Sequence, residues 1–223
     1  MRTKVLLGLA ALAVGLSTSI AQNVYSLNVV GYYNVSVKGN AGLTLVANQL
    51  NNGTNGISQV IPTSALGAQV LTFVNNDYNV DVYDGTAWLD NNTGNPSTTV
   101  LPPGKGFFYS TAAGAAAGTV TFVGEVPQGA VNLTLPAALA LVGTTTPQAL
   151  ELSSANGFPQ VVGSQVLYFD NTINDYVVYV NDGTQWLDNN TGNPVALTPA
   201  VGQGWFWQSL TAAAWNRNFT VAP

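Results

Sequence analysis

A chain of 223 residues with 5 Lys and Arg, 10 Asp and Glu, and neither His nor Cys cannot use several common mechanisms. Without His and Cys there is no Ser–His or Cys nucleophile system, no zinc site of the usual ligand set and no disulfide. A net charge of −5 without a basic cluster also argues against nucleic acid as a partner, because phosphates require clustered Lys and Arg.

The first 21 residues have the features of a secretory signal peptide. Arg2 and Lys4 form a positive n-region, residues 5–16 are apolar, and Ser19-Ile20-Ala21 resembles a cleavage site that leaves Gln22 as the mature start. The apolar run is too short to span a hydrocarbon core of about 30 Å, and no later run reaches about 18 apolar residues. We therefore expect an exported protein, extracellular, on the cell surface or periplasmic, without a membrane span after signal cleavage.

The mature chain contains a tandem duplication. Nine residues, Trp88 to Pro96, return unchanged as Trp186 to Pro194, 98 positions later. Further matches join 67–71 with 163–167, 84–86 with 182–184, and 104–109 with 202–207. We expect two copies of one module, residues 22–125 and 126–223. Because the connection at 126–129 is too short to be a free linker, the copies should pack side by side.

Period-two alternation of β-branched and aromatic residues predicts the strands. In chain order, the first copy has them at 29–37, 43–48, 69–74, 79–83, 106–110 and 119–123. The second copy has them at 131–135, 139–143, 165–170, 175–180, 205–208 and 218–221. The predicted fold class is all-β, with two tandem antiparallel sandwich or barrel modules and little helix.

The connections between these strands carry turn residues. Asp84-Gly85 favours a tight hairpin, because Gly accepts positive φ without a Cβ penalty. Short helical turns are expected within 58–66 and 147–154. The Ala-rich segment 112–117 is interrupted by Gly, and we interpret it as a hairpin loop between the strands at 107–109 and 120–123.

The repeated loop that follows each Trp, at 90–95 and 188–193, is rich in oxygen donors. Ca²⁺ takes about six to eight oxygen ligands, and the first and third positions of both loops fit a calcium-binding loop. No Glu closes either loop, which favours the alternative, a turn in which Asp and Asn side chains bond their own backbone. The candidate calcium ligands are Asp90, Asn92, Asp188 and Asn190.

Aromatic residues supply the candidate ligand-binding side chains. Trp88 and Trp186 lie beside Asp and Asn, as in sugar-binding surfaces where a ring stacks on a pyranose; the alternative is that each fills the core at a hairpin end. Three consecutive aromatic residues at 107–109 and 205–207 occupy both faces of a strand. We expect burial of at least one face, with the middle ring opposite the outer two. The ligand candidates are Trp88, Trp186, Trp205 and Trp207.

Paired carboxylates could support glycoside hydrolysis. The obvious pairs are Asp84 with Asp90 and Asp182 with Asp188, and both pairs lie in turn sequences. A small chain seldom needs two identical active sites, so we expect no enzyme activity and no cofactor, with calcium as the open alternative.

Several segments resemble known protein families. The segments 43–48, 69–73 and 103–109 resemble modules of prokaryotic exported and surface proteins that end in Pro-Gly-Lys-Gly followed by aromatic residues. The segments 29–32, 122–129 and 214–219 are closer to exported β-repeat proteins of Verrucomicrobia. This resemblance implies a β-rich extracytoplasmic module and carries no known activity or site residues.

Together these features predict a non-catalytic, exported structural or cell-surface interaction protein. The alternative is a secreted carbohydrate-binding protein that uses exposed aromatic rings. The expected partner is accordingly a glycan or another surface protein, and the oligomeric state is left open.

Overall fold

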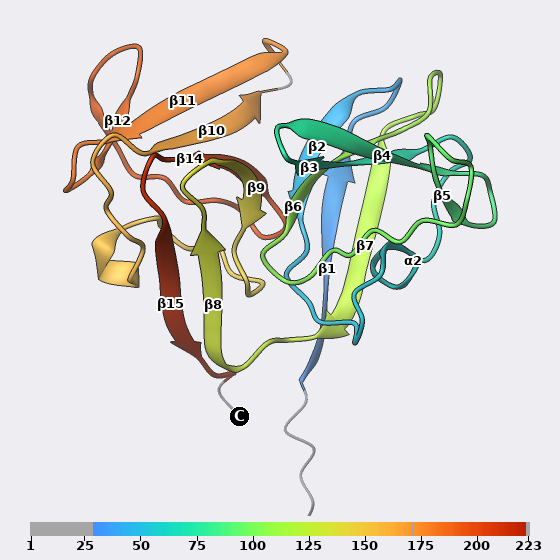
Figure 1. Cartoon of the computed structure of the whole chain (residues 1–223), viewed down its shortest axis with the longest axis horizontal. Helices are drawn as coiled ribbons and strands as arrows, with labels where there is room; N and C mark the ends of the chain where they lie inside the picture. Colours follow the sequence, from blue (N-terminus) through green and yellow to red (C-terminus); the bar gives the residue numbers. More distant parts are fainter. Residues whose placement is uncertain (1–28, 171, 222–223) are drawn as a thin grey trace, which may run out of the picture.

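The computed structural model describes residues 29–170 and 172–221, which form two lobes of the same architecture (Figure 1). Each lobe has one main antiparallel sheet and one two-stranded ribbon. Within the described residues, helix is confined to α2 (Ile57–Val60) and the 3₁₀ turn η1 (Ser154–Asn156). The all-β prediction is therefore confirmed. The predicted signal peptide, residues 1–21, lies outside the described residues.

The first lobe contains the strands β1 to β7. Its sheet has the order β2-β6-β3-β4-β5, and its ribbon pairs β1 with β7. The strands are β1 (Val30–Val37), β2 (Leu43–Ala47), β3 (Gln69–Val74), β4 (Asp77–Tyr83), β5 (Trp88–Asp90), β6 (Gly106–Ser110) and β7 (Gly118–Glu125). The ribbon thus pairs the first strand of the lobe with its last strand.

The second lobe repeats this plan with β8 to β15. Its sheet has the order β13-β12-β11-β10-β14-β9, and its ribbon pairs β8 with β15. The strands are β8 (Gly129–Leu135), β9 (Leu139–Gly143), β10 (Gln165–Asp170), β11 (Asp175–Asn181), β12 (Trp186–Asp188), β13 (Pro194–Val195), β14 (Gly204–Gln208) and β15 (Ala213–Phe219). Only the short edge strand β13 has no named counterpart in the first lobe.

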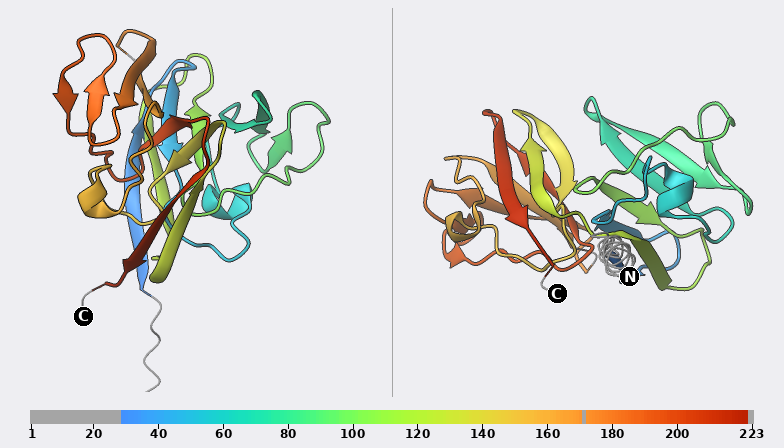
Figure 2. Two further views of the ribbon diagram at one scale, coloured as in Figure 1. Left: turned by 60° about the vertical axis from the view of Figure 1, so that its left-hand side comes forward. Right: turned by 90° about the horizontal axis from the view of Figure 1, so that it is seen from below.

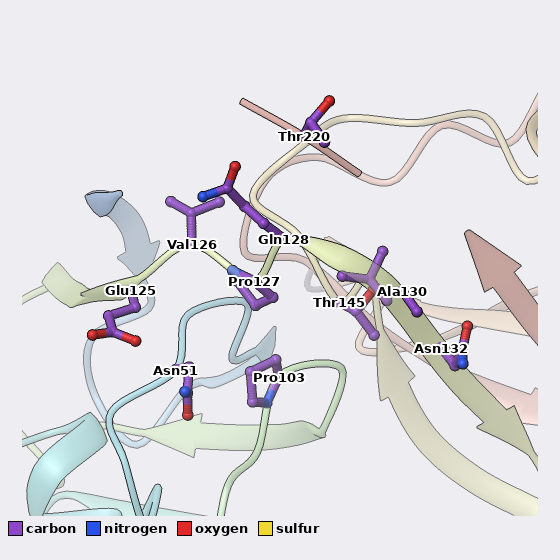
Figure 3. A pocket seen from close by; sticks show the side chains of 11 residues that line it. Asn51, Pro103, Glu125, Val126, Pro127, Gln128, Ala130, Asn132, Thr145 and Thr220 are labelled. Carbon is purple, nitrogen blue, oxygen red and sulfur yellow. The ribbon is translucent and has the colours of Figure 1, made fainter. Parts of the chain in front are cut away.

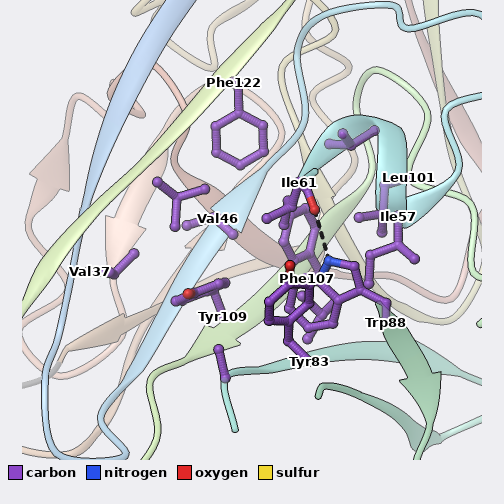
Figure 4. Close-up of a cluster of buried hydrophobic side chains, with 14 of the residues drawn as sticks. Val37, Val46, Ile57, Ile61, Tyr83, Trp88, Leu101, Phe107, Tyr109 and Phe122 are labelled. Carbon is purple, nitrogen blue, oxygen red and sulfur yellow. Dashed lines mark hydrogen bonds between the residues drawn. The ribbon is translucent and has the colours of Figure 1, made fainter. Parts of the chain in front are cut away.

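Each lobe has its own core between ribbon and sheet. In the first lobe, Trp88 is buried beside Tyr83 and Phe107, and its indole N–H donates to the carbonyl of Ile61 over 2.8 Å (Figure 4). In the second lobe, Trp186 donates in the same way to the carbonyl of Leu152 over 2.7 Å. These bonds let a large ring be buried without an orphaned donor.

A third hydrophobic cluster lies between the two sheets. Phe108 and Phe206, the middle members of the aromatic runs, meet there with ring centroids 6.2 Å apart. Because side chains alternate along a strand, the outer rings at 107, 109, 205 and 207 point into the lobe cores instead. Both faces of these strands are therefore buried, which goes beyond the expectation that at least one face would be.

The loop that carries Gly104, before β6, and the loop that carries Gly202, before β14, form hydrogen bonds between the two lobes. The backbone N–H of Gly143 donates to the carbonyl of Gly104 over 3.0 Å, and that of Ala47 donates to Gly202 over 2.9 Å. The buried side chain of Gln49 adds a further bond, because its Oε1 accepts from the N–H of Gly202 over 2.9 Å. Each lobe thus inserts a loop into the other, and the two lobes lie directly side by side in the view from below (Figure 2).

The structure corrects three local predictions. Residues 112–117 do not close a hairpin, because β6 pairs with β2 and β3 while β7 pairs with β1 in the ribbon. The last strand, β15, occupies Ala213–Phe219 instead of 218–221, because it pairs along its whole length with β8. The helical turn expected within 147–154 is instead η1, which begins only at Ser154.

Candidate functional site

The two repeated loops are turns closed by their own Asp. Oδ1 of Asp90 accepts from the backbone N–H of Asn92 over 2.9 Å, and from the backbone N–H and hydroxyl of Thr93 over 2.8 and 3.0 Å. Asp188 repeats the arrangement with Asn190 and Thr191. The bond from the Thr93 backbone is the largest of the effects that hold the pKa of Asp90 below its usual value.

This geometry bears on the candidate calcium ligands. The Oδ1 atoms of Asp90 and Asp188 already accept three hydrogen bonds each, and Asn92 and Asn190 contribute backbone N–H groups to them. A carboxylate oxygen used in this way is a poor metal ligand. Across 29–170 and 172–221, no three His, Cys, Asp or Glu side chains gather where they could hold a metal ion.

All four candidate tryptophans lie in the lobe cores. The exposed fraction of the side chain is 1% for Trp88, 3% for Trp186 and 0% for Trp205 and Trp207. The indole of Trp207 also donates to the carbonyl of Pro136 over 3.1 Å. A ring enclosed on both faces cannot stack on a sugar, so the structure does not support these residues as ligand contacts. Their size and apolarity serve the core.

The carboxylates considered for catalysis are also held in turns. Asp84 accepts from the backbone and hydroxyl of Thr86 and from the backbone of Ala87, and the Ala87 bond contributes most to lowering its pKa. The hydroxyl of Thr184 has the largest part in lowering the pKa of Asp182 to about 2. Both groups are therefore ionised at neutral pH, whereas a glycosidase acid needs a raised pKa.

The outer face of the ribbon β1–β7 exposes apolar side chains. Tyr32 and Val123 are directly opposite each other, with 74% and 53% of their surfaces exposed. The neighbouring Val30 on the same face is 67% exposed. In the ribbon of the second lobe the corresponding pair is Ala130 opposite Asn218. Sequence reasoning missed this face, because the run 29–37 contains apolar residues at both alternating sets of positions.

A cavity of about 660 Å³ lies where the two lobes are connected (Figure 3). Val126 and Pro127 of the connection line it, together with Asn51 and Pro103 from the first lobe and Thr145 from the second. Its lining mixes apolar carbon with amide and hydroxyl groups, and no charged cluster marks a particular chemistry.

A smaller cavity of about 280 Å³ lies on the inner face of the first sheet. Its lining includes Thr72, Asn79, Asp90, Thr99 and Lys105. Lys105 is half-buried here, and this burial lowers the pKa of its ammonium group. The cavity is therefore polar, although it lies on the same face of the sheet as the hydrophobic core of the first lobe.

No protein-family model matches the chain, and no curated protein or solved structure matches it. Within the described part of the chain, no helix is long and apolar enough to cross a membrane.

Proposed function

We propose that this protein is a non-catalytic, exported interaction protein that binds a component of the cell surface through the outer face of the ribbon β1–β7. The observation that carries this proposal is the opposed pair Tyr32 and Val123, two apolar side chains exposed on a sheet face. Contiguous exposed apolar residues on a polar protein commonly mark a contact surface.

The duplication strengthens this argument. Both ribbons have the same backbone plan, so the fold alone does not require Tyr or Val at these positions. The second ribbon has Ala130 and Asn218 there, and both are exposed. The apolar pair is therefore a property of one copy, which is expected if it serves recognition instead of packing.

The absence of catalysis is proposed on separate grounds. The chain has no His or Cys, and five Asp carboxyls have pKa values below the usual one. An ionised carboxyl group cannot act as a general acid, and the Oδ1 atom of each of these five residues already accepts hydrogen bonds within its turn.

The test is cosedimentation of the mature protein with a cell-envelope preparation from the producing organism. The double variant Tyr32→Ser and Val123→Thr should lose binding while its melting temperature stays near that of the wild type, because both side chains are exposed. The matched control is Ala130→Ser and Asn218→Thr on the second ribbon, which should bind as the wild type does. Equal binding by all three proteins would contradict the proposal.

Tyr32 also favours the second candidate function, a secreted carbohydrate-binding protein. Its ring is accessible, and on the same face the hydroxyl of Thr121 donates to the side chain of Asn34 over 2.7 Å. An aromatic ring beside amide and hydroxyl groups is a common sugar-binding arrangement. A glycan array tests this candidate: saturable binding to one glycan class that Tyr32→Ser abolishes would identify the bound component as a sugar.

A further inference from the structure

The ribbon β1–β7 has one covered edge and one open edge. The edge formed by β1 faces the second lobe, whose Gly202 loop lies against Tyr33 and Val35, while β7 lies on the far side (Figure 1). In an antiparallel pair, alternate residues exchange both backbone hydrogen bonds with their partners, and the residues between them direct their N–H and C=O groups away. The free backbone groups of β7 therefore lie along the edge that is remote from the second lobe.

Glu125 shows which residues of β7 point to this edge. It exchanges both backbone hydrogen bonds with Asn51, over 2.8 and 2.9 Å, so its N–H and C=O point away from β1. Residues two apart along a strand point the same way, so Thr119, Thr121 and Val123 also direct their backbone groups to the open edge. Among the residues that the structure describes, no hydrogen bond outside the β1–β7 ladder reaches the N–H or C=O groups of these three.

The sequence of β7 does nothing to protect this edge. Exposed edge strands usually carry Lys, Pro or a bulge, which prevents pairing with another chain. β7 has neither Lys nor Pro, its register with β1 is unbroken, and its three outward residues are all β-branched, which favours an extended strand. The counterparts on β15 in the second lobe are Ala214, Asn216 and Asn218, which are residue types that strands disfavour.

A groove of about 430 Å³ follows the open edge. It touches both the inward Val120 and the outward Thr121, so it lies at the edge between the two faces of the ribbon. The segment 61–65 also lines it, and there the hydroxyls of Ser64 and Tyr109 are 2.6 Å apart. None of the lining residues is charged, so a charged side chain entering the groove would lose water without gaining an ionic partner.

We propose that an extended, uncharged polypeptide segment of a partner protein binds in this groove by adding to β7 as a third strand. The open edge offers three N–H and three C=O groups at the spacing that another strand matches. The chain itself begins such a strand at Asn51, which makes one bridge with Glu125 and then turns away. This inference rests on the proposed function and adds the chemistry of the partner, because the third strand would continue the face that exposes Tyr32 and Val123.

A second copy of the chain is the competing occupant, because its β7 has the same open edge. The segment 61–65 beside the groove leaves room for one strand. A second copy would instead bring a two-stranded ribbon together with its own segment 61–65, and these two segments would meet. A single extended segment therefore fits the edge better than a second ribbon does.

The test uses the mature protein and, as the probe, a synthetic peptide of about seven alternating Thr and Val residues with both ends blocked. Binding and amide hydrogen exchange are followed by NMR. In the free protein, the amides of Thr119, Thr121 and Val123 should exchange faster than those of Val120 and Phe122, which are bonded to β1. Saturating peptide should slow exchange at the three outward amides by at least about tenfold.

Thr121→Pro removes one outward N–H and keeps the pairing with β1, because Pro is tolerated where the N–H of an edge strand faces solvent. It should weaken peptide binding by at least about tenfold, since a backbone donor is lost and the ring blocks the approach of the strand. Thr121→Val keeps the N–H and should bind as the wild type does. The matched control is Asn216→Pro on β15, which should also bind, and melting curves show that each variant is folded.

No saturable peptide binding by the wild type, or equal binding by Thr121→Pro, would overturn the inference. So would a dimer of the wild type in sedimentation velocity that Thr121→Pro abolishes, because the occupant would then be a second copy.

Cosedimentation with the cell envelope separates this inference from the proposed function. Envelope binding that is lost in the Tyr32→Ser and Val123→Thr double variant but kept by Thr121→Pro would overturn the third strand and leave the proposed function standing. Peptide binding that Thr121→Pro abolishes, without any envelope binding by the wild type, would support the strand site and overturn the proposed function.

Discussion

Truncating Phe206 to alanine tests whether the interface between the lobes stabilises the fold. The ring is 3% exposed and contacts Phe73 and Tyr176, with centroid distances of 5.4 and 5.5 Å. Burying a Phe side chain contributes about 1.5–3 kcal/mol, and the cavity left by truncation raises the loss to about 3–5 kcal/mol. Because a folded domain is stable by only about 5–15 kcal/mol, this loss is readily measured.

The assay for Phe206→Ala is urea unfolding followed by tryptophan fluorescence, with the free energy obtained by linear extrapolation. The control is Leu210→Ala, since Leu210 is 100% exposed and its truncation should change stability by no more than about 0.5 kcal/mol. A loss below about 1 kcal/mol for Phe206→Ala would refute the argument that the ring is packed between the sheets.

Three further predictions concern the core, the glycine loops and pH. Trp205→Ala should cost about 3–5 kcal/mol, and native tryptophan fluorescence should resist acrylamide, since Trp205 is fully buried; free quenching would contradict this. Gly202→Ala should lower the melting temperature of the protein more than Gly192→Ala does. Both residues have a positive φ, but only a Cβ at position 202 would meet the side chain of Val35. Equal losses of melting temperature would contradict the insertion of this loop into the first lobe. The pKa of Asp182 in the folded protein is lowered from the usual 3.8 to about 2. Ionised Asp182 therefore stabilises the fold fully above pH 3.8, and this stabilisation is lost as the pH falls from 3.8 through 2. Asp182→Asn should flatten the dependence of the melting temperature on pH in that window.

The sequence predicted local features whose causes are local. The strand Gly106–Ser110 was predicted with its observed bounds, because its run of three aromatic residues and the Gly residues that precede this run mark it without reference to any partner. The hairpin at Asp84-Gly85 was also predicted, and Gly85 has a φ of 98°. Turn chemistry of this kind depends on a few neighbouring residues and is therefore visible in one sequence.

Long-range pairing was not predictable in the same way. Nothing in the run at 118–125 shows that it pairs with residues 30–37, far away in the chain, instead of the preceding strand. The strand at 213–219 was missed over most of its length, because three consecutive Ala residues conceal the period-two pattern that its pairing with β8 imposes.

The candidate sites depended on knowing which face of each strand is buried. Alternation shows that Asp81 and Asn79 share a face, but it does not show that the opposite face packs against the other lobe. Trp205 and Tyr32 illustrate the same limit, because both lie in runs of apolar residues and only the tertiary packing buries one and exposes the other. Burial is set by neighbouring elements, and a single sequence does not specify them.

The residues that meet between the lobes also limit how alike the two copies can be. Ala47 and Gly143 occupy equivalent positions on β2 and β9, and a Cβ placed on Gly143 would overlap that of Ala47. Equivalent positions that touch each other lie on an approximate twofold axis, where a dimer of identical chains must present the same residue twice. Two alanines could not fit there, but a covalent tandem can place Ala on one side and Gly on the other. Joining the copies in one chain thus permitted an asymmetric contact that separate identical subunits could not form, and it left each copy free to change its own surface.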